Sequence, residues 1–277
     1  MPFRWILEIE CWVLDIQKRV LMGDKREFVV YSETDVCGIR RAAQAAAQVR
    51  ERLPSMVRPG MSTKEIDNIA GAFIHSMGGV SAFLGYRGYP GIICISLNDE
   101  VVHGIGREDR FVKEGDLVSL DIGVNVGGFI GDTATSFVLG GTTEPDTLRL
   151  LTFTGKALEE GIKAALPGNY VRNISEAVEK VAKSAKLGIV REYCGHGCGA
   201  CLHDPPEIPN YVTANRGPQL RPGMVLAIEP MLNLGTSRVI TDADGWTVRS
   251  SDGRLSAHFE HMVLITKSEP EILTWLK

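Results

Sequence analysis

Residues 113–121 read KEGDLVSLD, and residues 221–229 read RPGMVLAIE. In both segments a glycine is followed by an apolar run that ends in a carboxylate, Asp121 in the first and Glu229 in the second. The second segment lies 108 residues after the first, and two Pro-Gly pairs have the same separation, Pro59-Gly60 and Pro167-Gly168. A constant separation indicates an internal duplication. We therefore expect two halves related by a pseudo-twofold axis, with Asp121 and Glu229 in equivalent, facing positions.

Both halves contain the same order of predicted elements, a capped helix followed by segments typical of β-strands. A capping box from Ser62 to Glu65 starts the first helix, and residues Asn173 to Glu176 start the second. Two further helices are predicted at 34–57 and 146–165. The predicted strands are 92–97, 117–124, 224–229 and 261–266. Together these elements predict an α+β protein with a central antiparallel sheet covered by helices.

The duplication also predicts the domain limits. These are an N-terminal extension at 1–30 and one globular domain at 31–277, with halves at about 33–142 and 146–275. Residues 1–21 are apolar, but three acidic residues interrupt them and no small-residue cleavage site follows. We therefore interpret this segment as a peripheral extension and not as a signal peptide.

Composition excludes several classes of protein. The chain has 277 residues, of which 44% are apolar and 23% charged, as in ordinary globular proteins. A net charge of -4 gives no indication of nucleic-acid binding, and no run approaches the roughly 20 apolar residues that cross a membrane. The six cysteines lack the even spacing of a secreted disulfide scaffold, so we expect a reducing cytoplasm.

Four carboxylates lie beside apolar runs typical of buried strands. Asp121 lies within LVSLDIGV, and a glycine pair follows, so a hairpin would bring Asp132 beside it. Glu229 and Glu260 flank the runs MVLAI and HMVLIT. Buried carboxylates are normally paired, hydrogen-bonded or bound to metal, and several oxygen donors together favour one or two divalent cations. Separate ion pairs at strand ends are the alternative, but the duplication favours a shared site.

One histidine stands out by its neighbours. Flanking glycines, as in Gly195-His196-Gly197, let a backbone approach a site closely. A neutral imidazole commonly completes a metal site that is rich in carboxylates. His103 and His203 also lie in loop-like sequence beside glycine or aspartate, whereas we interpret His75 and His258 as structural.

Five motifs resemble, in order and spacing, those of the type I methionine aminopeptidases of peptidase family M24. They are NDEVVHGI (98–105), LDIGVNVGGFIGDTATSF (120–137), GHGCGACLHDPP (195–206), LAIEPM (226–231) and FEHMVLIT (259–266). The resemblance implies a pita-bread fold and a hydrolase that removes the N-terminal methionine from nascent proteins whose second residue is small. It also implies two divalent ions (Co, Mn, Fe, Zn or Ni), a cytoplasmic monomer and transient contact with the ribosome.

The resemblance implies a role for individual residues. The implied metal ligands are Asp121, Asp132, His196, Glu229 and Glu260, with Asp132 and Glu260 bridging the two ions. A water molecule activated by the metals would attack the first peptide carbonyl, with Glu229 handling the proton. His203 would lie near the developing oxyanion and His103 near the substrate amide or amine. The implied methionine pocket consists of Phe83, Tyr86, Tyr89, Cys94, Leu202 and Trp246, for which plain core packing is the alternative.

Two other functions remain open. Cys194, Cys198 and Cys201 reproduce the spacing that binds an iron–sulfur cluster in radical enzymes, although that motif normally follows an early strand. A prolidase or X-Pro aminopeptidase would have the same fold, but such enzymes usually carry an additional N-terminal domain. The phenylalanine at 83 and the cysteine at 198 depart from the residues usual in the resembled family and bear on fine substrate preference.

Overall fold

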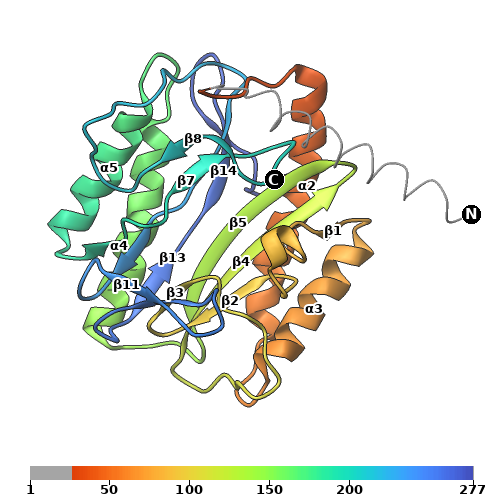
Figure 1. Ribbon diagram of the computed structural model, residues 1–277, viewed down its shortest axis with the longest axis vertical. Helices are drawn as coiled ribbons and strands as arrows, with labels where there is room; N and C mark the ends of the chain where they lie inside the picture. Colours follow the sequence, from red (N-terminus) through yellow and green to blue (C-terminus); the bar gives the residue numbers. More distant parts are fainter. Residues whose placement is uncertain (1–26, 277) are drawn as a thin grey trace, which may run out of the picture.

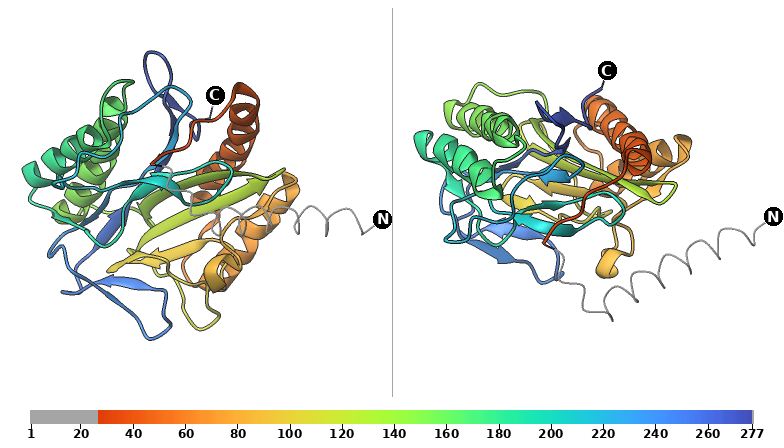
Figure 2. Two further views of the ribbon diagram at one scale, coloured as in Figure 1. Left: turned by 45° about the horizontal axis from the view of Figure 1, so that its top comes forward. Right: turned by 90° about the horizontal axis from the view of Figure 1, so that it is seen from above.

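The computed structural model describes residues 27–276, so most of the predicted N-terminal extension lies outside the described residues. Two helices lie on one side of the molecule and two on the other, with the strands between them (Figures 1 and 2). The helices are α2 (Glu33–Arg52), α3 (Thr63–Ser76), α4 (Pro145–Ala164) and α5 (Val171–Ser184), with short 3-10 helices η1 (Leu53–Met56) and η2 (Tyr86–Gly88). None of the helices within 27–276 is both long and apolar enough to span a membrane.

The helix starts follow local hydrogen bonding. The predicted capping box of α3 is confirmed, because Ser62 Oγ accepts from Glu65 N and Glu65 Oε2 accepts from Ser62 N. The predicted start of α5 at Asn173 is wrong, because the helix already begins at Val171. There the Asn173 side chain accepts a hydrogen bond from Tyr170 N at 2.8 Å, as the third residue of the helix and not as its cap. The helix predicted at 34–57 ends as α2 at Arg52, since the proline in η1 lacks the N–H that an α-helix needs.

Within residues 27–276 the strands form four sheets, and neighbouring strands in them pair antiparallel. One sheet contains β1 (Val80–Ser81), β2 (Cys94–Leu97), β4 (Leu117–Val126) and β5 (Phe129–Val138). The largest contains β7 (Gly195–Gly197), β8 (Asp204–Ile208), β9 (Val225–Ile228), β14 (His261–Leu264) and β15 (Glu271–Ile272). The two small sheets consist of β6 (Gly188–Ile189), β10 (Met231–Asn233) and β13 (Ser256–His258), and of β3 (Glu100–Val102), β11 (Val239–Thr241) and β12 (Val248–Ser250).

The long hairpin of β4 and β5 is the framework of the first half. Its turn is formed by Gly127 and Gly128, whose φ angles of 60° and 85° favour glycine. Helix α2 packs across both strands. At Gly131 the approach is so close that a Cβ atom would overlap the backbone of Ala42. The predicted hairpin is thus present, and only glycine lets the helix lie directly on it.

In the second half α4 and α5 pack against each other and cover the largest sheet. Apolar residues of both helices, such as Ile162 and Ile174, form one buried cluster with Leu226 and Ile228 of β9. Phe28 packs against this cluster, so the described chain is attached to the core from just after its first residues. The strand that leads to Glu229 is therefore fixed by helix packing on one face. Its other face is turned toward the first half.

Candidate active site

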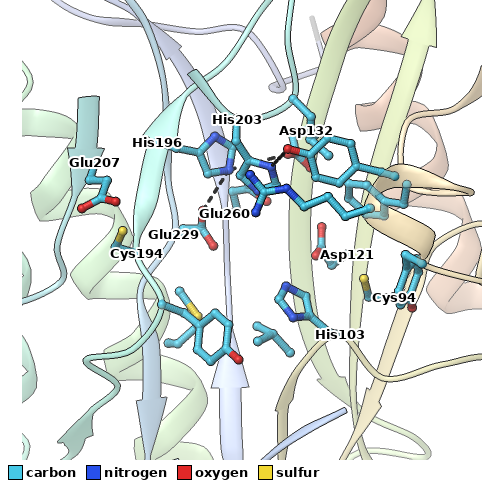
Figure 3. A pocket seen from close by; sticks show the side chains of 18 of the residues that line it. Cys94, His103, Asp121, Asp132, Cys194, His196, His203, Glu207, Glu229 and Glu260 are labelled. Atoms are coloured by element: carbon cyan, nitrogen blue, oxygen red, sulfur yellow. Dashed lines mark hydrogen bonds and ion pairs between the residues drawn. The ribbon is translucent and has the colours of Figure 1, made fainter. Parts of the chain in front are cut away.

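A cavity of about 510 Å³ lies between the two halves of the molecule (Figure 3). Its walls contain carboxylates, histidines and aromatic residues from both the earlier and the later part of the chain. All the residues that the sequence nominated for chemistry line it: Phe83, Tyr86, Tyr89, Cys94, His103, Asp121, Asp132, His196, Leu202, His203, Glu229, Trp246 and Glu260. Residues separated by up to 177 positions in the chain therefore share one cavity.

The hairpin places the two aspartates on one face of its sheet. Asp121 on β4 is paired with Ala134, and Asp132 on β5 is paired with Gly123. Asp132 lies two positions before Ala134, the partner of Asp121, on the same strand. Because side chains alternate between the two faces of a strand, both aspartates lie on the same face of the sheet. Both point into the cavity, as Figure 3 shows.

The second half contributes the other donors. Glu229 directly follows β9, and Glu260 precedes β14 and forms an isolated bridge with Ala134 of β5. His196 lies at the centre of β7, where its Nε2 atom is 3.3 Å from Glu229 Oε1 and 4.0 Å from Asp132 Oδ2. The glycines on either side of His196 are required, because a Cβ at Gly195 or Gly197 would meet the backbone of the neighbouring strands.

The carboxylates are buried without enough partners. Asp121 Oδ1, Asp132 Oδ1 and Glu260 Oε1 are buried and have no hydrogen-bond partner among the described residues. Burial raises the pKa of Asp121 and of Glu229 to about 7, and burial together with neighbouring carboxylates raises the pKa of Asp132 and Glu260 well above the usual range. Such a group is costly unless a cation neutralises it.

The donors fit a divalent metal ion. One ligand atom each from Asp132, His196 and Glu260 lies within 4.8 Å of the others, and all three residues are buried. Carboxylate oxygens and a neutral imidazole suit several first-row metals, so the donor set accommodates a metal without selecting one. The unpaired oxygens, the raised pKa values and the short separations point to the same conclusion.

His258, which the sequence led us to interpret as structural, lies beside this group. Its Nε2 atom is buried, lies 3.5 Å from Glu229 Oε2 and has no hydrogen-bond partner among the described residues. Burial lowers the pKa of its ring. A usable indication was its spacing, because residues two apart in an extended chain, here His258 and Glu260, share a face.

The two remaining histidines of the predicted site, His103 and His203, lie on different sides of the carboxylates (Figure 3). The ring of His203 lies at the cavity rim, with centroids 4.3 Å from the ring of His196, and its Nδ1 atom is 2.9 Å from the Tyr86 hydroxyl. His103 has a φ of 61° and packs edge-on against Tyr193 at 5.2 Å. Loss of hydration lowers the pKa of His103 to about 4, and loss of hydration together with nearby His196 and Arg87 lowers that of His203 to about 3.

An apolar pocket adjoins the carboxylates. Phe83, Tyr89, Cys94 and Leu202 are buried in one cluster, against which Tyr86 and Trp246 pack. The Tyr89 and Trp246 rings meet edge to face with centroids 5.1 Å apart. The Tyr89 hydroxyl lies 2.9 Å from the Gly104 carbonyl and 3.1 Å from the Ile93 carbonyl, so its one hydrogen is used by the backbone. The pocket surface is therefore mainly aromatic carbon and sulfur.

The three cysteines of the iron–sulfur hypothesis do not form a cluster. Cys194 lines the cavity, whereas Cys198 is buried in the apolar cluster beneath it. Within 27–276, the group of Asp132, His196 and Glu260 is the only set of three or more such donors close enough to hold a metal ion. The cysteine spacing in the sequence thus has no counterpart in space among these residues.

Comparisons with known proteins agree with this geometry. The model of metallopeptidase family M24 matches residues 37–267. The methionine aminopeptidase 1 of Bacillus subtilis is 45% identical over 236 residues, which are 85% of this chain and 94% of the relative. The methionine aminopeptidase of Treponema pallidum is 46% identical over 239 residues, which are 86% of this chain and 92% of the relative.

Solved structures are similar over the same range. The methionine aminopeptidase of Thermotoga maritima superposes with a TM-score of 0.87 at 36% identity, covering 90% of this chain and all of that one. The prolidase of Pyrococcus horikoshii has a TM-score of 0.71 at 19% identity, with 90% of this chain and 64% of that chain covered, so its likeness concerns the fold alone. The chain therefore belongs to metallopeptidase family M24, has its pita-bread fold and groups within it with the methionine aminopeptidases.

Proposed function

We propose that this chain is a dinuclear metal-dependent aminopeptidase that removes the N-terminal methionine from nascent proteins when the second residue is small. One observation carries the proposal. A group of buried carboxylates with unpaired oxygens lies directly beside a closed apolar pocket lined by aromatic rings and a thiol. A thioether side chain fits such a pocket, and the carboxylates suit the metals that hydrolysis requires.

Five side chains would hold the two ions: Asp121, Asp132, His196, Glu229 and Glu260. When bound, the metals supply Lewis acidity at the scissile carbonyl and lower the pKa of a water molecule. Cobalt, manganese, iron, zinc and nickel all suit this mixture of oxygen and nitrogen donors.

The chain's own residues hold and move the proton. Glu229 is the carboxylate between the two histidines His196 and His258, with one oxygen 3.3 Å and the other 3.5 Å from their Nε2 atoms. In the proposed reaction Glu229 accepts the proton of the attacking water and delivers it to the leaving amine.

His203 and His103 act on the substrate. His203, at the cavity rim, would donate a hydrogen bond to the developing oxyanion, and His103 would contact the substrate amide or amine. The lowered pKa values of both rings keep them neutral at neutral pH. A neutral donor stabilises negative charge without placing an additional positive charge beside the metals.

The pocket accounts for the choice of residue. Phe83, Tyr89 and Cys94 close its base, and Trp246 closes its side. A free α-amine would lie among the carboxylates. When protonated it would be attracted by their negative charge, and when neutral its lone pair could bind a metal ion that they hold. Acetylation removes both properties, so a blocked N-terminus would not bind. We also propose that the enzyme acts as a cytoplasmic monomer with transient ribosome contact, and the cysteine spacing, unlike that of a secreted disulfide scaffold, supports the location.

The test is methionine release from a Met-Ala-Ser peptide after removal of metal. We expect chelation to abolish release and addition of a divalent ion to restore it. Persistent cleavage by protein that contains no metal would contradict the proposal. Faster cleavage of X-Pro peptides than of Met-Ala-Ser would instead support the prolidase-like alternative, which shares the fold.

A further inference from the structure

The loop between β7 and β8 carries residues that the proposed reaction uses. His196 lies in β7, and His203 directly precedes β8. The two strands are neighbours in the largest sheet, so residues 198–203 form the loop that joins them. Leu202 and His203 of this loop line the cavity. The conformation of the loop therefore determines where the imidazole of His203 can lie.

Tyr31 reaches this loop from a distant part of the chain. Its hydroxyl oxygen accepts a hydrogen bond from Ala200 N at 3.0 Å, and its hydroxyl donates to Asp204 Oδ2 at 3.0 Å. A backbone N–H only donates and an ionised carboxylate only accepts, so a single phenol satisfies both. The Tyr31 hydroxyl thus joins the middle of the loop to the residue that follows His203.

The ring of Tyr31 lies directly on the loop backbone. A Cβ atom at Gly199 would be 2.6 Å from Cζ of the ring and 2.7 Å from its hydroxyl oxygen, so only glycine lets the phenol approach this closely. The ring also packs against the apolar cluster that contains Cys198 and Leu202. Packing and hydrogen bonding therefore hold the phenol and the loop together.

The backbone of Tyr31 is itself anchored to the second half of the molecule. Tyr31 N donates a hydrogen bond to Gly223 O at 2.9 Å. Phe28 packs against the cluster that α4 and α5 form with β9, and the Cζ atom of Arg221 lies 5.0 Å from the centroid of its ring. Residues 28–31 precede α2 in the sequence, yet they are bound to the part of the molecule that contains β7 and β8. The phenol is consequently a fixed point for the loop.

We propose that Tyr31 is a positioning residue that fixes the loop between β7 and β8 and, through it, the place of His203 in the cavity. Without the hydroxyl, the Ala200 N–H loses its acceptor and Asp204, the neighbour of His203, loses a donor. A histidine that must meet a developing oxyanion tolerates little displacement, because such stabilisation depends on exact placement. The inference rests on the proposed function for the role of His203, but the fixation of the loop is a property of the protein alone.

The direct test is amide hydrogen exchange of the metal-free protein and of Tyr31→Phe, which keeps the ring and removes only the hydroxyl. We expect the Ala200 amide to exchange about three- to tenfold faster in Tyr31→Phe, the effect of one lost hydrogen bond. The Leu226 amide in the buried strand β9 should exchange equally in both proteins, because the fold is retained. An unchanged rate at Ala200, or an equal increase at both amides, would overturn the inference.

Tyr211→Phe is the matched control, since it also removes the hydroxyl of a half-buried tyrosine. Its ring packs against a different apolar cluster and does not line the cavity. We expect the exchange rate at Ala200 and the kcat of this variant to equal those of the unsubstituted protein. The same change at Ala200 in Tyr211→Phe as in Tyr31→Phe would show that the effect is not specific to Tyr31 and would also count against the inference.

A kinetic double-mutant cycle separates the positioning of His203 from simple packing. For a Met-Ala-Ser peptide, at equal metal content, we expect Tyr31→Phe to lower kcat about tenfold while KM changes little. In protein that carries His203→Ala, the same substitution should lower kcat by less than about twofold, because the residue through which Tyr31 acts is gone. Equal losses in both backgrounds, or a rise in KM with kcat retained, would contradict the positioning role. Absence of peptidase activity in the unsubstituted protein would instead contradict the proposed function, and the exchange rates would still decide whether Tyr31 fixes the loop.

Discussion

Cys94 on β2 and Asp121 on β4 are directly paired across the sheet, so their side chains lie on the same face. Cys94 belongs to the apolar pocket, and Asp121 belongs to the group of carboxylates. One strand pair thus fixes the distance between the part of the cavity that would bind a side chain and the part that would hold metal. Rigid placement of this kind is what an exopeptidase needs to cleave at one bond only.

Substrate choice follows from this arrangement. We expect cleavage of Met-Ala, Met-Gly and Met-Ser peptides, weak cleavage of Met-Leu, and none of N-acetylated peptides. In the proposed function the carboxylates anchor the free amine, and a small second residue is preferred. Measurement of kcat/KM over this set of peptides checks the order. Met-Leu cleaved as fast as Met-Ala would show that the second residue is not restricted.

Loss of a ligand should abolish activity. His196→Ala and Asp121→Asn remove donors without removing apolar packing, so we expect at least about a 100-fold loss of methionine release with the fold retained. Circular dichroism and metal analysis on the same samples verify the fold and the metal content. His75→Ala is the control, since that side chain is exposed on α3 and does not line the cavity. Full activity of His196→Ala with normal metal content would remove His196 from the metal site.

His203→Ala should separate chemistry from metal binding. We expect kcat to fall by about 10²-fold or more, as loss of an oxyanion donor typically does, while the metal content stays the same. Assays at saturating peptide concentration give kcat, and metal analysis of the same sample gives the metal content. An unchanged kcat would make His203 a structural neighbour of the adjoining prolines and not a participant in the reaction.

The buried carboxylates predict an unusual pH dependence in the metal-free protein. Burial raises the pKa of Asp121 to about 7 from its usual value of 3.8, so the folded state retains a proton that the unfolded state has lost. This group therefore stabilises the fold below about pH 4, relative to higher pH, and the contribution is lost as pH rises to 7. Asp121→Asn cannot titrate, so its stability relative to the unsubstituted protein should increase by up to about 1.4 kcal/mol per pH unit over that window.

The comparison with a variant is essential because histidines act in the opposite direction. His103 and His203 have lowered pKa values and so destabilise the folded state as pH falls below their unfolded values near 6.5. A difference between two proteins that share these histidines cancels their contribution. Denaturant unfolding of both proteins between pH 4 and 7.5 gives the difference. A difference independent of pH would show that Asp121 is ionised throughout.

Gly131 offers a test of the fold. A Cβ atom at this position would overlap the backbone of Ala42, which cannot move without displacing α2. We expect Gly131→Ala to lower the free energy of unfolding by about 1–3 kcal/mol, the usual cost of overpacking. Gly155→Ala is the matched control. Gly155 lies within α4, and a Cβ added there would meet no atom within 4 Å beyond its own stretch of helix. This substitution should stabilise the helix by up to about 1 kcal/mol. Chemical denaturation of both variants measures the effects.

Strands with continuous apolar sequence were predictable. The segments predicted at 117–124 and 261–266 correspond to β4 (Leu117–Val126) and β14 (His261–Leu264), because burial on both faces leaves a clear apolar run. The three-residue strands β3, β10 and β13 have too few residues for any periodic pattern. They exist because neighbouring strands offer hydrogen-bond partners, which is tertiary information.

The cavity was predictable where the chain is duplicated and less so elsewhere. Asp121 and Glu229 were identified by the repeat, but their proximity to His258 depends on how β13 pairs with β10. The relation between Tyr86 and His203 joins positions 117 residues apart and had no indication in the sequence. Side-chain hydrogen bonds across such separations follow from packing and not from local pattern.

The most direct test of the account is a calorimetric titration of the metal-free protein with Mn²⁺, repeated with His196→Ala. The five donors predict that the unsubstituted chain binds two ions and that His196→Ala loses at least the site that its imidazole completes. Absence of Mn²⁺ binding by the unsubstituted chain, or equal binding by both proteins, would contradict the assignment of this cavity as a metal centre.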